Sequence, residues 1–95
     1  MTQVQIPLRA VVLREESGWV IQCLEHDIFA FGADFDTVVK RFQATLDAEA
    51  QLAPKDSEHP FAHIPKAPDY FHVLWDQQKT VLTTPVDGVE MAIAA

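Results

Sequence analysis

The chain has 95 residues, of which 14 are acidic and 7 are basic, so its formal net charge at pH 7 is -7. A chain of this length forms one domain, and an apolar fraction of 48% is sufficient for one hydrophobic core. The negative charge repels phosphate backbones, and no segment approaches the ~18 apolar residues that a membrane span needs. Direct binding to nucleic acid and contact with a membrane are therefore not expected, and a basic partner is favoured.

The single cysteine, Cys23, excludes a disulfide within the chain. Residues 1–3 lead directly into a strand-like pattern, without the basic and then apolar segments of a secretory leader. We therefore expect a cytoplasmic protein.

Three strand-like segments come first in the chain. Residues 4–14 place apolar side chains on one side of an extended backbone, and Pro7 indicates a sheet edge or a bulge near that position. A polar turn that ends at Gly18 leads into residues 19–25, which are apolar on both faces and are therefore expected to form a central strand. Residues 28–31 form a third short strand. This order predicts an antiparallel meander.

A helix follows the third strand. Gly32 ends that strand, because a residue without a side chain permits a positive-φ turn or a close backbone approach. Asp34 is suited to cap the helix by accepting backbone N–H groups, and Pro54 ends it at or just before Ala53. Between these limits an apolar stripe recurs at helical spacing, formed by Phe35, Val38, Val39, Phe42, Leu46 and Ala50. The stripe predicts that the helix packs across the sheet.

The rest of the chain is predicted to hold a rigid connection, a short helix and a last strand. Residues 54–68 contain four prolines, which favour an ordered surface connection. Pro68 suits a first helical position, and residues 69–79 have apolar side chains at helical offsets. Residues 88–93 alternate like a strand that pairs either within the sheet or with a second copy of the chain. The predicted fold class is α+β: an antiparallel three- to four-stranded sheet, one long helix packed on it, and a short C-terminal helix and strand.

Four short motifs lie at the predicted strand ends and helix starts. They are Gly18-Trp19-Val20, Cys23-Leu24-Glu25-His26-Asp27, Gly32-Ala33-Asp34, and Ile64-Pro65-Lys66-Ala67-Pro68 followed by Tyr70-Phe71. In this order they resemble the W-V, C-x-E-x-D, G-D-T-like and P-x-A-P segments of the HicB-like antitoxin family, in its stand-alone members. The motif residues with expected structural roles are Gly18, Trp19, Cys23, Glu25, Asp27, Gly32, Asp34, Pro65 and Pro68.

The resemblance implies a β-β-β-α-β core, like a truncated ribonuclease H or double-stranded-RNA-binding fold, that commonly assembles as dimers or tetramers. It does not imply catalysis. Full antitoxins of this family neutralise a small RNA-cleaving toxin through this domain and bind operator DNA through a separate segment. Since no basic segment follows residue 54, DNA binding is not expected here. The expected organisation is a single HicB-like domain over residues 1–95, with a core at 1–53, the connection at 54–68 and the C-terminal part at 69–95.

Four residues have spacings that would permit metal binding. Cys23-x-x-His26 and His59-x-x-x-His63 each bring two zinc ligands within reach of one ion. The simpler interpretation is a buried cysteine and surface histidines. Cys23 and His26 could also form a nucleophilic pair, although the flanking carboxylates would raise the thiol pKa. The alternative function is therefore a small metal-dependent or hydrolytic enzyme that uses these four residues.

Two further sets have both a chemical and a structural interpretation. A two-metal nuclease would use Glu25, Asp27, Asp34 and Asp36, of which the last two also suit the start of a helix. A stacking platform for single-stranded nucleic acid would use Trp19, Phe29, Phe31, Phe71 and Trp75, but such platforms are rimmed by basic residues, so core packing is favoured. We therefore predict a non-catalytic protein-interaction module without metal or cofactor, which forms a homo-oligomer and presents an acidic face to a basic protein such as an RNA-cleaving toxin.

Overall fold

Five strands and two helices make up the described part of the chain. The computed structural model describes residues 6–77, 81–86 and 89–94. The strands are β1 (Ile6–Glu15), β2 (Gly18–Cys23), β3 (Phe29–Gly32), β4 (Val81–Val86) and β5 (Val89–Ala94), and the helices are α1 (Phe35–Leu52) and α2 (Asp69–Gln77). The protein is therefore α+β, as the sequence predicts. Of the predicted strand and helix residues, 4–5, 78–79 and 88 lie outside the described part.

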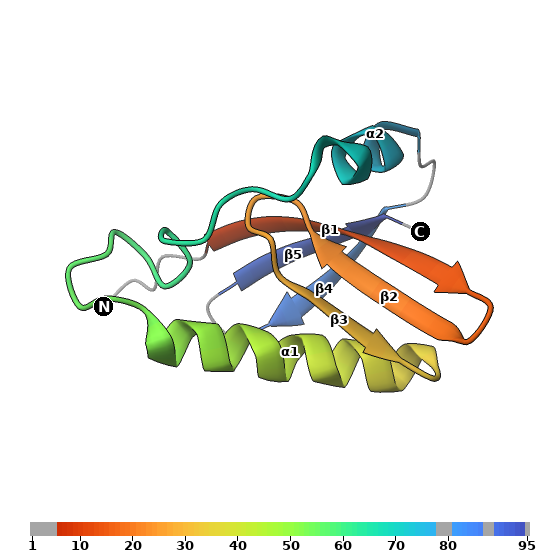
Figure 1. Cartoon of the computed structure of the whole chain (residues 1–95), viewed down its shortest axis with the longest axis horizontal. Coiled ribbons are helices and arrows are strands. Elements are labelled where there is room, and N and C mark those ends of the chain that lie inside the picture. The colour runs from red at the N-terminus through yellow and green to blue at the C-terminus, as the bar shows by residue number, and fades with distance from the viewer. Residues whose placement is uncertain (1–5, 78–80, 87–88, 95) are drawn as a thin grey trace.

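All five strands form one sheet in the order β3-β2-β1-β5-β4 (Figure 1). The antiparallel meander of β1, β2 and β3 is confirmed, and β2 lies between two neighbours as expected. Two features differ from the predicted antiparallel sheet of three to four strands. β5 runs parallel to β1, because the chain enters β4 after both helices and β4, antiparallel to β5, returns it to the end of the sheet where β1 begins. β4 adds a fifth strand, antiparallel to β5.

β4 is an edge strand that the sequence did not predict. Proline has no backbone N–H to donate, and an edge strand tolerates it because only one side of that strand forms a ladder. Pro7 in β1 is accommodated on a similar principle. The backbone N–H and C=O groups of Arg9 face the β2 side, where the carbonyl accepts the Leu24 N–H at 2.8 Å. The backbone nitrogen of Pro7, two residues earlier, faces the same side. Its missing N–H breaks no ladder there, because pairing with β2 begins only at Ala10.

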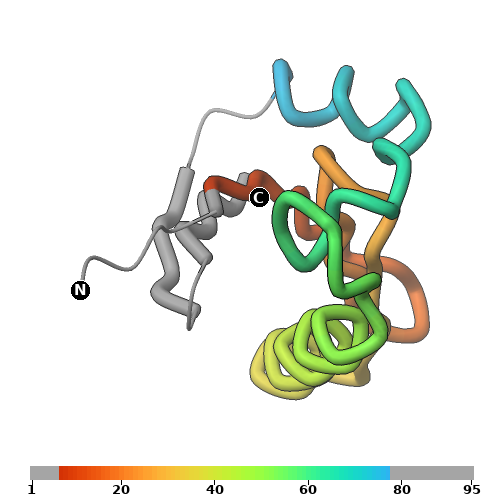
Figure 2. The backbone as a smooth tube through the Cα atoms, turned by 90° about the vertical axis from the view of Figure 1, so that its left-hand side faces the viewer, coloured from red at the N-terminus to blue at the C-terminus, as the bar shows by residue number. Residues whose placement is uncertain are grey.

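The two helices lie on opposite faces of the sheet, as both views show (Figures 1 and 2). On one face the buried side of α1 packs on alternate residues of the meander. That core consists of Leu8, Ala10, Val12, Ile21, Cys23, Ile28, Ala30, Val38, Phe42, Leu46 and Phe61. On the other face Val11 and Leu24 are covered by Phe71, Leu74 and Trp75 of α2. α2 thus covers the second face at Val11 of β1 and at Leu24, directly after the end of β2.

α1 begins and ends where its local sequence dictates. The Asp34 side chain accepts the Thr37 N–H at 2.8 Å, and the helix ends at Leu52, two residues before Pro54. Its stripe buries Val38, Phe42 and Leu46, each of which contributes about 1.5–3 kcal/mol relative to exposure. The stripe therefore fixes α1 on the sheet.

Gly32 and Gly18 allow two close backbone approaches. A Cβ atom on Gly32 would lie 2.6 Å from the Val38 nitrogen, so α1 can follow β3 this tightly only if residue 32 has no side chain. A Cβ atom on Gly18 would lie 2.5 Å from the Gly32 carbonyl oxygen. Because these two glycines have no side chains, the start of β2, the end of β3 and the start of α1 can pack closely together.

The proline-rich connection is ordered, but it is not only a surface segment. Phe61 is 2% exposed and joins the core beneath α1, and Ala67 is also buried. The connection is fixed to the turn between β2 and β3, since the Asp27 N–H donates to the Pro65 carbonyl at 2.7 Å. Burial of the Phe61 side chain therefore brings part of this donor-poor segment into the core. In the part of the chain that the structure describes, no helix combines the length and the apolarity that a bilayer crossing requires.

Candidate functional site

The four proposed metal ligands do not come together. Cys23 is fully buried at the end of β2, where burial raises the pKa of its thiol to about 11. His26 and His59 lie side by side with ring centroids 5.3 Å apart. His63 instead faces Glu49, with Nε2 and Oε2 3.9 Å apart. Within residues 6–77, 81–86 and 89–94, no group of three or more His, Cys, Asp or Glu side chains is arranged to hold a metal ion.

His26 and His59 both have backbone partners. His26 Nδ1 lies 2.8 Å from the Ile64 carbonyl oxygen, so this nitrogen carries the proton and donates it. His59 Nδ1 accepts the Phe61 N–H at 3.2 Å. Phe61 packs against both rings, with centroids 5.9 and 6.5 Å away. The two histidine rings therefore pack the β2–β3 turn against the proline-rich connection.

The four proposed nuclease carboxylates lie at the two ends of β3, and Glu25, Asp27 and Asp34 have structural partners. Glu25 accepts from the Arg9 backbone N–H and from its guanidinium Nε, each at 2.6 Å. Asp27 accepts from Gln22 Nε2 at 3.0 Å. At the other end of β3, the backbone N–H of Thr37 lowers the pKa of the Asp34 carboxyl group. Asp36, in the first turn of α1, lies at that same end.

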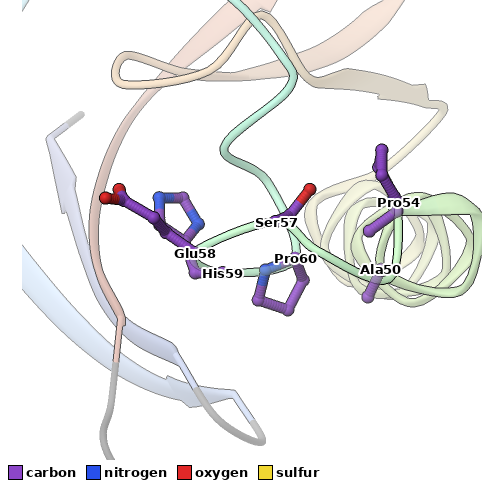
Figure 3. Close-up of a pocket in the computed structure, with 7 residues that line it drawn as sticks. Ala50, Pro54, Ser57, Glu58, His59 and Pro60 are labelled. Carbon is purple, nitrogen blue, oxygen red and sulfur yellow. The ribbon is translucent and has the colours of Figure 1, made fainter.

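A pocket of about 310 Å³ lies between the C-terminal end of α1 and the start of the connection (Figure 3). It is lined by Ala50, Ala53, Pro54, Ser57, Glu58, His59 and Pro60. The Ser57 hydroxyl and the Glu58 carboxylate point in different directions (Figure 3). Because Nδ1 of His59 also accepts from the backbone, these polar groups do not converge on one reacting atom.

The proposed aromatic platform divides between the two faces of the sheet. Trp19 lies on the α1 face, edge-on to Phe35 at 5.8 Å, while Phe71 and Trp75 cover the opposite face. Core packing is therefore the correct interpretation for these residues of the set. It is wrong for Phe29 and Phe31, which are 59% and 43% exposed.

Phe29 and Phe31 belong to an apolar surface on the α2 side of the sheet. The strand register aligns Leu13, Val20 and Phe31 in one row across β1, β2 and β3. In the next row Phe29 lies beside Gln22. Leu13 and Val20 are half-buried, and with the exposed Phe29 and Phe31 they form what we call the exposed sheet patch. α2 covers the neighbouring row at Val11 but not this patch.

The comparisons with known proteins were negative. No family model, no curated protein and no solved structure matches the chain. The interpretation of the patch therefore depends on its own chemistry.

Carboxylates border the exposed sheet patch. Glu15 lies two residues beyond Leu13 on the same strand and is exposed, and Glu16 follows in the hairpin turn. At the other end Asp27 is exposed and bonded to Gln22, the strand partner of Phe29. An apolar centre with a charged rim is the arrangement of a protein-binding surface.

The sequence does not reveal this patch, because the run 28–31 is apolar throughout. The structure buries Ile28 and Ala30 beneath α1 and leaves the alternate Phe29 and Phe31 outside. A signal was present in the alternation of large aromatic with smaller side chains, but it did not reveal which face a helix would cover.

Proposed function

We propose that the protein is a non-catalytic interaction module with a HicB-like β-β-β-α-β core that binds a basic protein. The resemblance in its motifs suggests a small RNA-cleaving toxin as that protein, and the cytoplasm as the place where the two meet. The observation that carries the proposal is the exposed sheet patch with its acidic border, on a molecule of net charge -7. Exposed aromatic side chains surrounded by charge are typical of binding surfaces.

The order of the elements supports the HicB-like core. β1, β2 and β3 form a meander, α1 packs on one face of it, and a later strand, β5, returns beside β1. This is the succession that the resemblance implies. β4 and α2 are additions to it.

The non-catalytic part of the proposal is supported by the positions of the candidate reactive groups. Cys23 is buried and protonated at neutral pH, and His26, three residues further along the chain, is bonded to the Ile64 carbonyl. A nucleophile needs a thiolate that substrate can reach. Neither condition is met at Cys23.

Self-association is a second part of the proposal. Among the described strands β4 pairs with β5 alone, so apart from Pro85 its other side offers backbone groups to a second copy of the chain. Sedimentation velocity over a range of concentrations tests it, with a dimer or tetramer as the expected species.

Binding and inhibition assays test the toxin partner. The probes are any short basic protein encoded beside the gene and a panel of purified basic RNA-cleaving toxins. We expect one of them to bind at low ionic strength, with an affinity that weakens as salt rises, and to lose its RNA-cleaving activity at equimolar protein. Failure of every probe at low ionic strength, where electrostatic attraction is greatest, contradicts the proposed function.

A further inference from the structure

We infer that the exposed sheet patch is the docking site, and that it binds a segment in which an aromatic or aliphatic side chain is flanked by Lys or Arg. The inference rests on the proposed function and adds to it the surface and the chemistry of the partner. It follows from the register of the strands, the backbone at the β3 edge and the charges around the patch.

The patch is a continuous apolar surface held in place by the sheet. Leu13, Val20 and Phe31 are direct cross-strand neighbours, so their side chains touch or nearly touch on one face. The Phe31 ring also leans over Gly18, since a Cβ atom on this glycine would lie 2.8 Å from Phe31 Cζ. A ring supported in this way loses little conformational freedom on binding, which favours its use as an anchor.

The β3 edge itself is poorly suited to pairing with an added strand. β3 has only four residues, and Arg41 Nη1 of α1 already donates to the outward-facing Phe31 carbonyl at 3.0 Å. An incoming strand would have to displace that bond. Contact through the side chains of the sheet face is therefore favoured over backbone pairing.

The border of the patch selects a basic partner over a second copy. Glu15 and Glu16 lie at its hairpin end, and Asp27 lies next to Phe29. The nearby Arg9 is paired with Glu25 at 2.6 Å, and Arg14 lies over the Trp19 ring, 5.5 Å from its centroid. In a two-fold contact between copies the same carboxylates would oppose one another, whereas Lys or Arg beside an apolar anchor would pair with them.

The test uses a display library of random 12-residue peptides selected on the full chain. We expect the enriched peptides to combine an aromatic or aliphatic residue with Lys or Arg. Their binding should shift the backbone NMR signals of Leu13, Val20, Phe29 and Phe31. Enrichment of neutral or acidic peptides, or shifts on another surface, would overturn the inference. So would an empty selection.

Paired variants locate the binding energy. Phe29→Ser should weaken the affinity for a selected peptide at least about tenfold. Leu52→Ser, which changes a 75% exposed side chain at the end of α1, should leave that affinity unchanged. The double variant Glu15→Gln, Glu16→Gln should weaken the affinity for the peptide at low salt, whereas the control double variant Asp47→Asn, Asp56→Asn should not. Equal effects of the paired variants contradict the inference, and thermal melts of each variant establish that it is folded.

The results separate the inference from the proposed function. A toxin that binds with its NMR footprint elsewhere refutes the docking site and leaves the function standing. Basic peptides that bind the patch when no toxin binds refute the function and leave the docking site standing. If Phe29→Ser instead abolishes self-association, a second copy occupies the patch and the inference is wrong.

Discussion

His26 and Ile64 are joined across 38 positions of sequence by a hydrogen bond of 2.8 Å between the His26 Nδ1 atom and the Ile64 carbonyl oxygen. Directly beside it, the Asp27 N–H donates to the Pro65 carbonyl at 2.7 Å. These two bonds attach the proline-rich connection to the turn between β2 and β3. The connection carries Phe61 into the core, so its attachment also affects the packing beneath α1.

His26→Ala should loosen the connection. The Ile64 carbonyl loses its partner, which costs about 1 kcal/mol of unfolding free energy, and the segment around Lys66 opens more often. Trypsin cleavage after Lys66 should therefore become faster in native buffer. His63→Ala is the control, because His63 only faces Glu49 at 3.9 Å. Equal cleavage rates in the two variants would contradict a role for the His26 bond.

Gly32→Ala should destabilise the protein by about 1–3 kcal/mol, which is the usual cost of inserting an atom into a packed site. The new methyl group would meet the backbone of Val38, at 2.6 Å from its nitrogen and 2.8 Å from its Cα, and a helix backbone cannot rotate away as a side chain can. Urea unfolding monitored by tryptophan fluorescence measures the loss. Ala33→Ser, at an adjacent exposed position, should leave the midpoint nearly unchanged.

The two carboxylate oxygens of Glu25 accept different hydrogen bonds from Arg9, and substitutions can separate the contributions of these bonds. Glu25→Gln keeps an oxygen for the Arg9 N–H but removes the ion pair, so we expect a loss below about 1 kcal/mol that shrinks in high salt. Glu25→Ala removes both bonds and should cost more, with a part that salt does not abolish. Equal losses for the two variants at high salt would show that the backbone bond contributes nothing.

The elements that the sequence predicted have local causes. The α1 boundaries follow from a cap at Asp34 and a proline at position 54, and its buried face follows from apolar spacing. Gly18 and Gly32 were expected at a turn and at a close backbone approach, and both stand where a Cβ atom would collide with backbone. Such features depend on a few neighbouring residues, which a sequence displays directly.

The features that the sequence did not predict depend on distant partners. Burial of Phe61 requires the connection to fold back on the core, and strand β4 around Pro85 requires β5 as its neighbour. His26 and His59 meet because the same connection returns to the β2 end, not because of their spacing. Exposure of Phe29 depends on where α2 stops covering the sheet. Apolar patterns mark what can be buried, but tertiary contacts decide what is.

The thiol of Cys23 should make the stability of the protein fall at alkaline pH. Burial, with a smaller contribution from the charge of Glu25, raises the pKa of this thiol from its ordinary value of 9.0 to about 11. The folded state thus holds the proton more tightly than the unfolded chain. The resulting stability is fully present below pH 9 and is lost as pH rises toward 11.

Cys23→Ala provides the reference for this prediction, because it lacks the thiol and keeps every other titrating group. The unfolding free energy of the natural chain should fall relative to that of the variant by about 1 kcal/mol between pH 9 and pH 10. Urea denaturation at a series of pH values, with reductant present, measures the difference. Parallel pH profiles of the two proteins would mean that the Cys23 thiol titrates alike in the folded and unfolded chain, and that its burial does not hold the proton.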